Sequence, residues 1–297
     1  MIRIGTRGSQ LALWQAEFTQ NALRAIGVDS ELHIIRTTGD QVQHLGFEKM
    51  EGKGFFTREI EDALLRGDID VAVHSMKDVP TEQPSGLVIG AVSYREDPAD
   101  LLLIRKDQVT EGQLLRLRPQ AIVGTSSARR KAQMLDFRPD LLLKDVRGNL
   151  PTRIEKLRSG AFDAILLAKA GISRLNLPLD DLFLLPFNPR EFVPAPAQGV
   201  LAWQTVASDT AVRKILQKIH NPQVSAATNV ERKTLKLLGG GCHMPLGVYC
   251  ERDAMGNFHV SAAMAESWDA PLHRVRLSSS TSFQLAEKVV QALRSNG

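Results

Sequence analysis

The stretch IRIGTRGSQLALWQAEFTQNALRAI, residues 2–26, decides the fold class. It opens with the apolar run IRIG (2–5) and, after a polar turn, continues as an amphipathic helical pattern over 10–26. A strand that leads directly into such a helix is the repeating unit of a parallel βαβ fold. The next pair has the same form, with LHIIR (32–36) followed by FTREIEDALLRG (56–67). We therefore predict an α/β protein.

Further apolar runs extend this alternation through the first two thirds of the chain. They are IDVAVH (69–74), AIVG (121–124), LLLKDV (141–146) and FDAILLA (162–168). Runs such as AILLA are apolar on both faces, which is typical of strands buried in a parallel sheet. A polar or glycine-bearing turn follows each run and usually leads into a helix.

The last third of the chain has a different pattern. After Asn221-Pro222 a helix is predicted to run as far as the glycines that begin at Gly239. Strands are then predicted at 245–251, 257–265 and 273–278, before a final helix. Consecutive strands joined by short turns indicate a small antiparallel α+β module.

Two proline-bearing passages, SYREDPAD (93–100) and LPFNPREFVPAPAQG (185–199), interrupt the α/β pattern. We interpret them as crossings, so that the chain enters a second α/β domain and then returns to the first. The predicted domains are an α/β domain 1 at 1–93 with 190–215, an α/β domain 2 at 97–186, and an α+β domain 3 at 219–297.

Composition narrows the class of protein. The chain has 297 residues, of which 43% are hydrophobic and 24% charged, and this balance excludes a disordered or fibrous protein. No apolar run is long enough to span a membrane, and the start MIRIG lacks the pattern of a signal peptide. We expect a cytoplasmic protein without a membrane partner. Its two cysteines, Cys242 and Cys250, have no metal-ligand spacing, so we expect no metal site.

The loops that follow the predicted strands carry hydroxyl groups and cations. They are Thr6-Arg7-Gly8-Ser9, Ser75-Met76-Lys77-Asp78, Thr125-Ser126-Ser127-Ala128-Arg129-Arg130 and Arg147-Gly148-Asn149. In α/β sheets, ligands bind beyond the carboxyl ends of the strands, and such loops bind anions. Each loop by itself also fits an ordinary helix cap with a solvated arginine. The repetition favours an anion site.

Two further arginines accompany these loops. Thr152 and Glu155 have the spacing of a capping box, which predicts a helix start that leaves Arg153 in the first turn. Arg174 follows the run 162–168 and fits either the anion site or an exposed position on a helix.

Several motifs, in this order, carry a resemblance to a known family. They are GTRGSQLALWQA, GKGFFTREIE, VAVHSMKDVP, VGTSSARR, VRGNLPTR, DAILLAKAGISRL, PAQG and LGGGCHMP, over residues 5–245. Together they closely resemble the porphobilinogen deaminases, also called hydroxymethylbilane synthases. The resemblance covers nearly the whole chain, and VHSMKDVP and GGGC at this spacing are its most specific parts.

The resemblance implies a fold and an activity. The fold would be two α/β domains similar to periplasmic binding proteins around a cleft, plus a small C-terminal α+β domain. The activity would be that of a monomeric transferase of tetrapyrrole biosynthesis, which supplies haem, chlorophyll and corrins. It joins four molecules of porphobilinogen head to tail, releases ammonia and yields hydroxymethylbilane. The cofactor would be one dipyrromethane, attached covalently to Cys242 through a thioether.

The resemblance also assigns residues to roles. Cofactor binding would fall to Cys242, Lys77, Ser126, Ser127, Arg129, Arg130, Arg147 and Gly199. Substrate binding would fall to Arg7, Ser9, Phe56, Arg153, Arg174 and Gln198. Arginine suits a ligand whose pyrrole rings each carry an acetate and a propionate.

Asp78 matches the catalytic aspartate of the family. Loss of ammonia from porphobilinogen leaves an azafulvene-like cation, which a fixed carboxylate near the pyrrole N–H stabilises. From the residues alone, Asp78 before Val79-Pro80 fits a turn cap equally well. Phe56, which resembles a pyrrole-stacking residue, also fits core packing, and core packing is what we expect for Cys250.

Two other classes of protein compete with this interpretation. A non-catalytic two-lobed protein that binds a carboxylate or oxyanion would show the same loops, but it would usually carry a signal peptide and no third domain. A nucleic-acid-binding protein is suggested by the pI of about 9.1. We expect no nucleic-acid partner, because aromatic and basic residues are not interleaved and no recognition motif is present.

Overall fold

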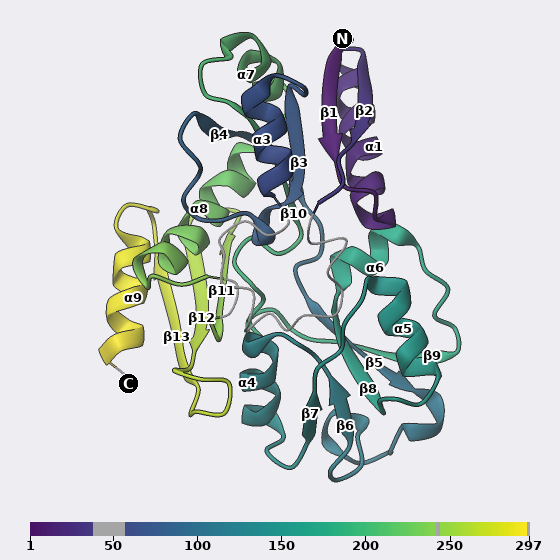
Figure 1. Cartoon of the computed structure of the whole chain (residues 1–297). Coiled ribbons are helices and arrows are strands. Elements are labelled where there is room, and N and C mark those ends of the chain that lie inside the picture. Colours follow the sequence, from purple (N-terminus) through teal and green to yellow (C-terminus); the bar gives the residue numbers. More distant parts are fainter. Residues whose placement is uncertain (38–56, 242–243, 296–297) are drawn as a thin grey trace. The chain divides into compact units, whose positions relative to one another are not determined.

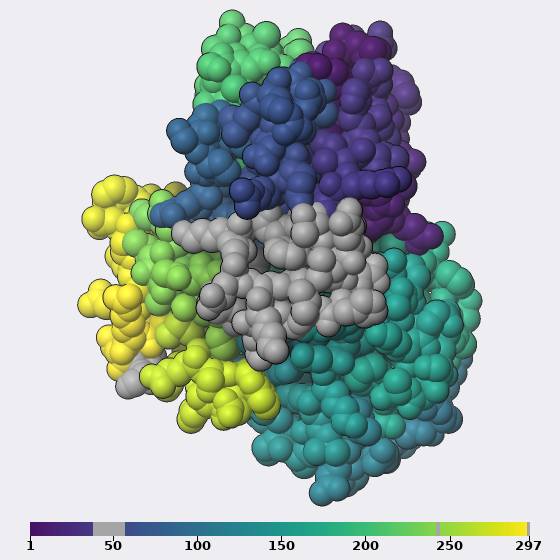
Figure 2. All heavy atoms as spheres, viewed as in Figure 1, coloured from purple at the N-terminus to yellow at the C-terminus, as the bar shows by residue number. Residues whose placement is uncertain are grey.

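The computed structural model describes residues 1–37, 57–241 and 244–295, drawn as a ribbon (Figure 1) and as spheres (Figure 2). The chain divides into two compact units. Unit 1 is Met1–Glu96 with Gly199–Ala226, and unit 2 is Asp97–Gln198 with Ala227–Gly297. The chain thus leaves unit 1 after Glu96 and returns at Gly199.

Unit 1 is built on a five-stranded mixed sheet. Its elements are β1 (Ile2–Thr6), α1 (Gln10–Ala25), β2 (Ser30–Ile34), α3 (Arg58–Arg66), β3 (Val71–Ser75), η2 (Met76–Asp78), β4 (Leu87–Arg95), β10 (Val200–Val206) and α7 (Thr210–Gln217). The strand order is β2-β1-β3-β10-β4. Strand β1 is parallel to β2 and β3, whereas β10 is antiparallel to β3 and β4.

The core of unit 1 is centred on the returning strand β10. Trp203 of β10 is 1% exposed and packs with apolar side chains of the sheet, among them Ile4 and Val73. Its indole Nε1 donates to Thr19 Oγ1 of α1 at 2.7 Å. A buried tryptophan combines a large apolar area with one donor that needs a partner. Trp203 therefore joins the last strand of the unit to its first helix.

Unit 2 contains a second five-stranded mixed sheet. Its elements are β5 (Asp100–Arg105), η3 (Lys106–Gln108), η4 (Leu114–Arg116), β6 (Ile122–Gly124), α4 (Ala128–Phe137), β7 (Leu142–Lys144), α5 (Leu150–Arg158), β8 (Ala164–Ala168), α6 (Lys169–Leu175) and β9 (Leu182–Pro186). The strand order is β7-β6-β8-β5-β9. Strand β6 is parallel to β7 and β8, whereas β5 is antiparallel to β8 and β9.

In each sheet, therefore, four strands run in one direction, and one strand, β10 or β5, runs antiparallel to both of its neighbours. The α/β class predicted from the sequence is confirmed, but the sheets are mixed rather than parallel throughout. The sequence pattern did not predict strands β5 and β10. They begin at the ends of the irregular passages 93–100 and 185–199, where the apolar pattern is interrupted. A strand with which the chain enters or re-enters a unit has no helix directly before it, so the strand-helix alternation does not indicate it.

The C-terminal part forms the predicted antiparallel α+β module. Helix α8 (Pro222–Leu237) precedes the sheet β11 (Leu246–Arg252), β12 (Phe258–Met264) and β13 (His273–Ser279), and α9 (Leu285–Ser295) ends it. Helix α9 lies beside β13 (Figure 1) and buries Leu285, Val289 and Leu293. Residues of this module from Ala227 onward belong to unit 2, so a separate third domain stays a prediction.

A buried glutamate connects this module to the end of the α/β part of unit 2. Glu231 of α8 is fully buried, and its Oε2 accepts from Ala197 N at 2.6 Å. Its Oε1 accepts from Cys250 N of β11 at 2.7 Å. Because of such contacts residues 190–198, which we predicted for domain 1, lie in unit 2. No helix of the described residues is long and apolar enough to cross a membrane.

Gly199 gives the first testable prediction. Its φ is +92°, and a Cβ built on it would lie 2.3 Å from the Glu96 carbonyl oxygen. Because that oxygen belongs to the backbone, Gly199→Ala should lower the free energy of unfolding by more than about 2 kcal/mol. The control is Gly27→Ala, where φ is +75° and no atom lies within 4 Å of the added Cβ. That change should cost about 1 kcal/mol, from the backbone alone.

Urea unfolding of both variants measures the difference. Equal losses at Gly199 and Gly27 would show that the close approach of Glu96 does not constrain the return of the chain.

Candidate functional site

In unit 1, the predicted site residues lie in the loops after β1 and β3, which are parallel neighbours. Ser9 is the N-cap of α1, and its Oγ accepts from Ala12 N at 3.3 Å. Arg7 before it is partly buried. Lys77 and Asp78 close the short helix η2, and the Lys77 side chain is partly buried. Since parallel strands end at one edge of a sheet, both loops belong to the same edge of unit 1.

Asp78 does not act as a turn cap. Its side chain is exposed, and its carboxylate makes no hydrogen bond or ion pair with any residue that the structure describes. A capping aspartate would accept a bond from a nearby backbone N–H. The carboxylate of Asp78 is therefore available to a ligand.

A buried polar network lies directly behind this turn. Gln204 Nε2 of β10 donates to Glu61 Oε1 at 3.1 Å and to Gln83 Oε1 at 2.8 Å. Gln204 Oε1 then faces His74 Nε2 at 3.1 Å, so the imidazole donates from Nε2. Gln83 in turn donates to the Pro80 carbonyl at 2.8 Å. The network thus joins the end of β3 to the segment that follows Asp78.

His74 is neutral in this network. Burial lowers its pKa to about 4, the hydrogen bond to Gln204 opposes the shift, and the charge of Arg7 adds to it. A buried imidazole stays neutral because one amide acceptor does not replace the water that the charged form would lose.

In unit 2, the predicted serines order the loop after β6. Ser127 is the N-cap of α4, and its Oγ accepts from Arg130 N at 3.4 Å. Ser126 Oγ donates to the Val146 carbonyl at 2.9 Å, which connects this loop to the one that contains Arg147. Arg147 is partly buried, with Nη2 4.0 Å from Asp145 Oδ2.

The start of α5 differs from the capping box predicted at Thr152 and Glu155. The N-cap is Asn149, whose Oδ1 accepts from Thr152 N at 3.0 Å and from Thr152 Oγ1 at 2.8 Å. Asparagine is as good a cap as threonine, and its earlier position allows the helix to begin at Leu150. Arg153 still lies in the first turn, where its Nε donates to the Gly148 carbonyl at 2.7 Å. Arg174 is buried in α6.

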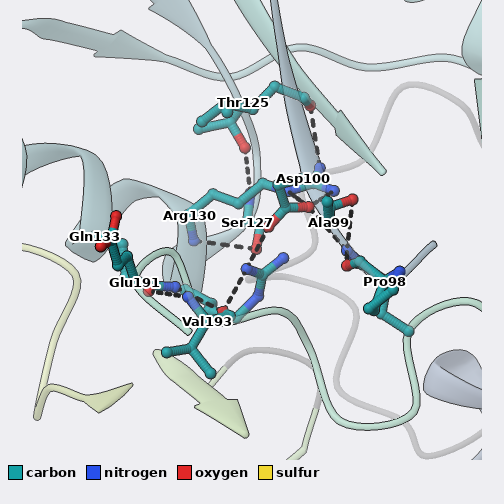
Figure 3. Close-up of polar contacts among 12 residues, drawn as sticks. Pro98, Ala99, Asp100, Thr125, Ser127, Arg130, Gln133, Glu191 and Val193 are labelled. Carbon is teal, nitrogen blue, oxygen red and sulfur yellow. Dashed lines mark hydrogen bonds and ion pairs between the residues drawn. The ribbon is translucent and has the colours of Figure 1, made fainter. Parts of the chain in front are cut away.

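Three of the predicted residues converge on one carboxylate that the sequence did not single out. It is that of Asp100, which Figure 3 shows beside Arg130. Asp100, the first residue of β5, is fully buried. Its Oδ2 accepts from Arg129 Nη1 at 2.6 Å, and its Oδ1 from Arg130 Nη2 at 2.7 Å. Gln198 Nε2 donates to the same Oδ1 at 3.0 Å and to the Pro98 carbonyl at 2.8 Å.

Asp100 is ionised in this cluster. Burial by itself raises the pKa of its carboxyl group, but the charges and hydrogen bonds of Arg129 and Arg130 outweigh burial and hold the pKa below its usual value. One signal in the sequence could have indicated it: an aspartate that opens the apolar run LLLI must find cations if the run is buried.

Other predictions concern cysteine, phenylalanine and metal. Cys242 and Phe56 lie outside the described residues. Cys250 is buried in β11, which confirms core packing. Among the residues that the structure describes, no group of three His, Cys, Asp or Glu side chains could hold a metal ion.

The fold and these loops define an α/β protein with cation-bearing strand ends. Residues 2–214 match the family model described as "Porphobilinogen deaminase, dipyromethane cofactor binding domain". Curated relatives named porphobilinogen deaminase include those of Nitratiruptor sp. (42% identical, covering 83% of this chain and 77% of the relative) and Syntrophomonas wolfei (43%, covering 89% and 85%). The chain belongs to the porphobilinogen deaminase family, and the resemblance seen in the sequence is confirmed.

The comparison with solved structures gives more distant matches. The periplasmic VFT2 domain of Bordetella pertussis BvgS is 14% identical, with a TM-score of 0.45 and coverage of 73% of this chain and 86% of that domain.

The buried His74 predicts how stability depends on pH. Because its folded pKa of about 4 lies below the ordinary value of 6.5, the unfolded chain binds a proton that the folded chain does not. Stability should therefore fall as the pH falls from 6.5 to about 4, by roughly 3 kcal/mol from this residue. In His74→Gln, whose amide can still donate to Gln204, this part of the pH dependence should vanish.

Denaturant unfolding at several pH values tests the role of His74. If the free energy of unfolding changed with pH equally in the wild type and in His74→Gln between pH 6.5 and about 4, His74 would not be the source of this pH dependence.

Proposed function

We propose that this chain is a transferase that joins four molecules of porphobilinogen head to tail and releases ammonia, with hydroxymethylbilane as the product. The observation that carries the proposal is the carboxylate of Asp78, which is exposed and makes no bond to a described residue, in the loop VHSMKDVP of the matched family domain. In a protein that only binds anions, an exposed carboxylate in the same loop as the binding cations would repel the ligand and weaken binding.

The cofactor of the matched family domain is dipyrromethane. The chemistry of the available donors fits it, since its pyrrole rings bear carboxylates and the loops carry guanidinium, ammonium and hydroxyl groups. Residues that would hold it, directly or through a neighbouring side chain, are Lys77, Ser126, Ser127, Arg129, Arg130 and Arg147, with Cys242 as the point of covalent attachment and Gly199 at the return of the chain. When bound, the cofactor supplies the primer to which porphobilinogen is added.

The protein's own residues then have separate tasks. Arg7, Ser9, Arg153, Arg174, Gln198 and Phe56 are the proposed substrate residues. Guanidinium groups bind the acetate and propionate of each incoming porphobilinogen and hold its ring in one orientation. Asp78 accepts a hydrogen bond from the pyrrole N–H and stabilises the positive charge that develops as ammonia leaves. The His74 network behind it keeps the turn in place.

We extend the proposal to the molecule's setting: a monomer in the cytoplasm without a nucleic-acid partner. Support comes from the family, whose substrate is a small soluble molecule. Sedimentation of the purified protein distinguishes a monomer from larger assemblies.

Cofactor attachment gives the next prediction. The wild-type chain should carry a mass increment equal to two porphobilinogens less two ammonias, and the increment should survive denaturation. Cys242→Ala should abolish it and keep the fold, but the melting temperature should fall, because a bound cofactor stabilises the folded chain. Cys250→Ala is the matched control: that thiol is buried in β11, so the variant should lose stability and keep the increment.

Intact mass spectrometry reads the result. An unmodified wild-type chain with full activity would refute the cofactor proposal, and an increment in Cys242→Ala would place the attachment elsewhere.

Asp78 allows binding and chemistry to be separated. Asp78→Asn should lower kcat and kcat/KM together by ~10²–10³, because it removes one electrostatic stabiliser of the transition state. Asp78→Glu keeps the charge but displaces it, so it should retain more activity than the asparagine variant. Neither change should alter the melting temperature by much, since the carboxylate is exposed and bonds to no described residue.

Single-turnover kinetics on the holo-protein is the measurement, with thermal melting beside it. Normal turnover in Asp78→Asn would remove Asp78 from the catalytic role.

A further inference from the structure

The cluster around Asp100 holds two cations and one anion. Arg129 and Arg130 are 5% and 7% exposed, and Asp100 is fully buried. Its carboxylate is the acceptor in the ion pairs of both arginines. Gln198, the other side chain on this carboxylate, is neutral. Among the described residues one positive charge of the cluster is therefore uncompensated, and a buried charge requires a counter-ion.

Arg129 and Arg130 differ in how many of their nitrogens donate hydrogen bonds to the described residues. Arg130 donates from all three of its nitrogens: Nε and Nη2 to Asp100 Oδ1 at 3.1 and 2.7 Å, and Nη1 to the Leu166 carbonyl at 3.0 Å. Arg129 reaches the other described residues only from Nη1, which donates to Asp100 Oδ2 at 2.6 Å and to the Val193 carbonyl at 2.9 Å. Its Nε and Nη2 have no acceptor among the described residues.

The surroundings fix this inequality. The Val193 carbonyl also accepts from Gln133 Nε2 at 2.9 Å, and Val193 N donates back to Gln133 Oε1 at 2.6 Å (Figure 3). These two hydrogen bonds to Gln133 of α4 hold in place the Val193 carbonyl that accepts from Arg129 Nη1. The Nε and Nη2 edge of Arg129 is therefore pre-organised to grip a carboxylate in bidentate fashion.

The electrostatics agree with an arginine that lacks part of its counter-charge. Burial lowers the pKa of Arg129, the attraction of Asp100 opposes this, and the repulsion of Arg130 adds to the lowering. The net direction is downward, because burial is the largest of these effects.

We propose that Asp100 is a positioning residue for the cofactor: it neutralises Arg130, which is thereby structural, and leaves Arg129 as the guanidinium of this pair that receives a carboxylate of dipyrromethane. This inference rests on the proposed function. It differs from a pocket in which both arginines contact the ligand alike.

The proposal predicts a rescue. Arg130→Gln alone leaves Asp100 with Arg129 as a neutral pair, so the fraction of chains that carry the cofactor should fall by about tenfold or more, as expected for a lost charged contact. Adding Asp100→Asn returns Arg129 to an uncompensated cation, and cofactor content should recover most of this loss. The matched control, Asp100→Asn with Arg129→Gln, has the same composition and charge but should stay depleted.

Cofactor content is read from intact mass and from the pyrrole colour reaction of the denatured chain, with melting temperature recorded separately. No rescue in Asp100→Asn/Arg130→Gln, or equal rescue in both double variants, would overturn the proposal. Absence of the cofactor from the wild-type chain would instead contradict the proposed function.

A second pair of variants keeps the charge and does not depend on the folding of the doubles. Lysine cannot serve Asp100 and a ligand in two directions as a guanidinium does. Arg129→Lys should therefore lower cofactor content by about tenfold, whereas Arg130→Lys, which still neutralises Asp100, should keep most of it. The reverse order would assign the ligand contact to Arg130 and refute the division of roles.

Discussion

A fully buried carboxylate has to be paired, and the arrangement of unit 2 around Asp100 follows from that constraint. Two guanidinium groups and an amide reach it from α4 and from the end of the return passage, so the first residue of β5 is joined to both. Removing one partner of a buried ion pair typically costs about 3–5 kcal/mol, which makes this contact difficult to replace. The same pairing determines which donors remain for a ligand, so stability and binding depend on one group.

Unit 1 follows the same principle, that buried polar groups must be paired. The donors and acceptors behind the Asp78 turn satisfy one another through Gln204, and the imidazole of His74 stays uncharged because it is buried. A satisfied network of this kind holds the loop to which it bonds. Asp78 therefore follows a strand end that these hydrogen bonds hold in place, while its own carboxylate bonds to no described residue.

The crossing of the chain between its units depends on a backbone position rather than on a charge. Gly199 has a left-handed φ where the carbonyl of Glu96 leaves no space for a side chain. Glu96 N donates to the Gly199 carbonyl at 3.0 Å, so the outgoing and returning passages meet within unit 1. Ala197, on the unit 2 side, also has a positive φ and is held by Glu231. Hydrogen bonds on both sides thus define where one unit ends.

The sequence by itself determined the α/β class, the C-terminal α+β module, the loops that contain Arg7, Asp78 and Arg147, and the family. These depend on periodicity and motif spacing, which are local properties of a chain. It did not distinguish β10, the cap at Asn149 or the partners of Arg129 and Arg130, because a serine, an arginine and an aspartate each fit several local roles. Only the tertiary structure brought Asp100 to residues 29 and 98 positions away in the chain, and burial left them no water to pair with instead.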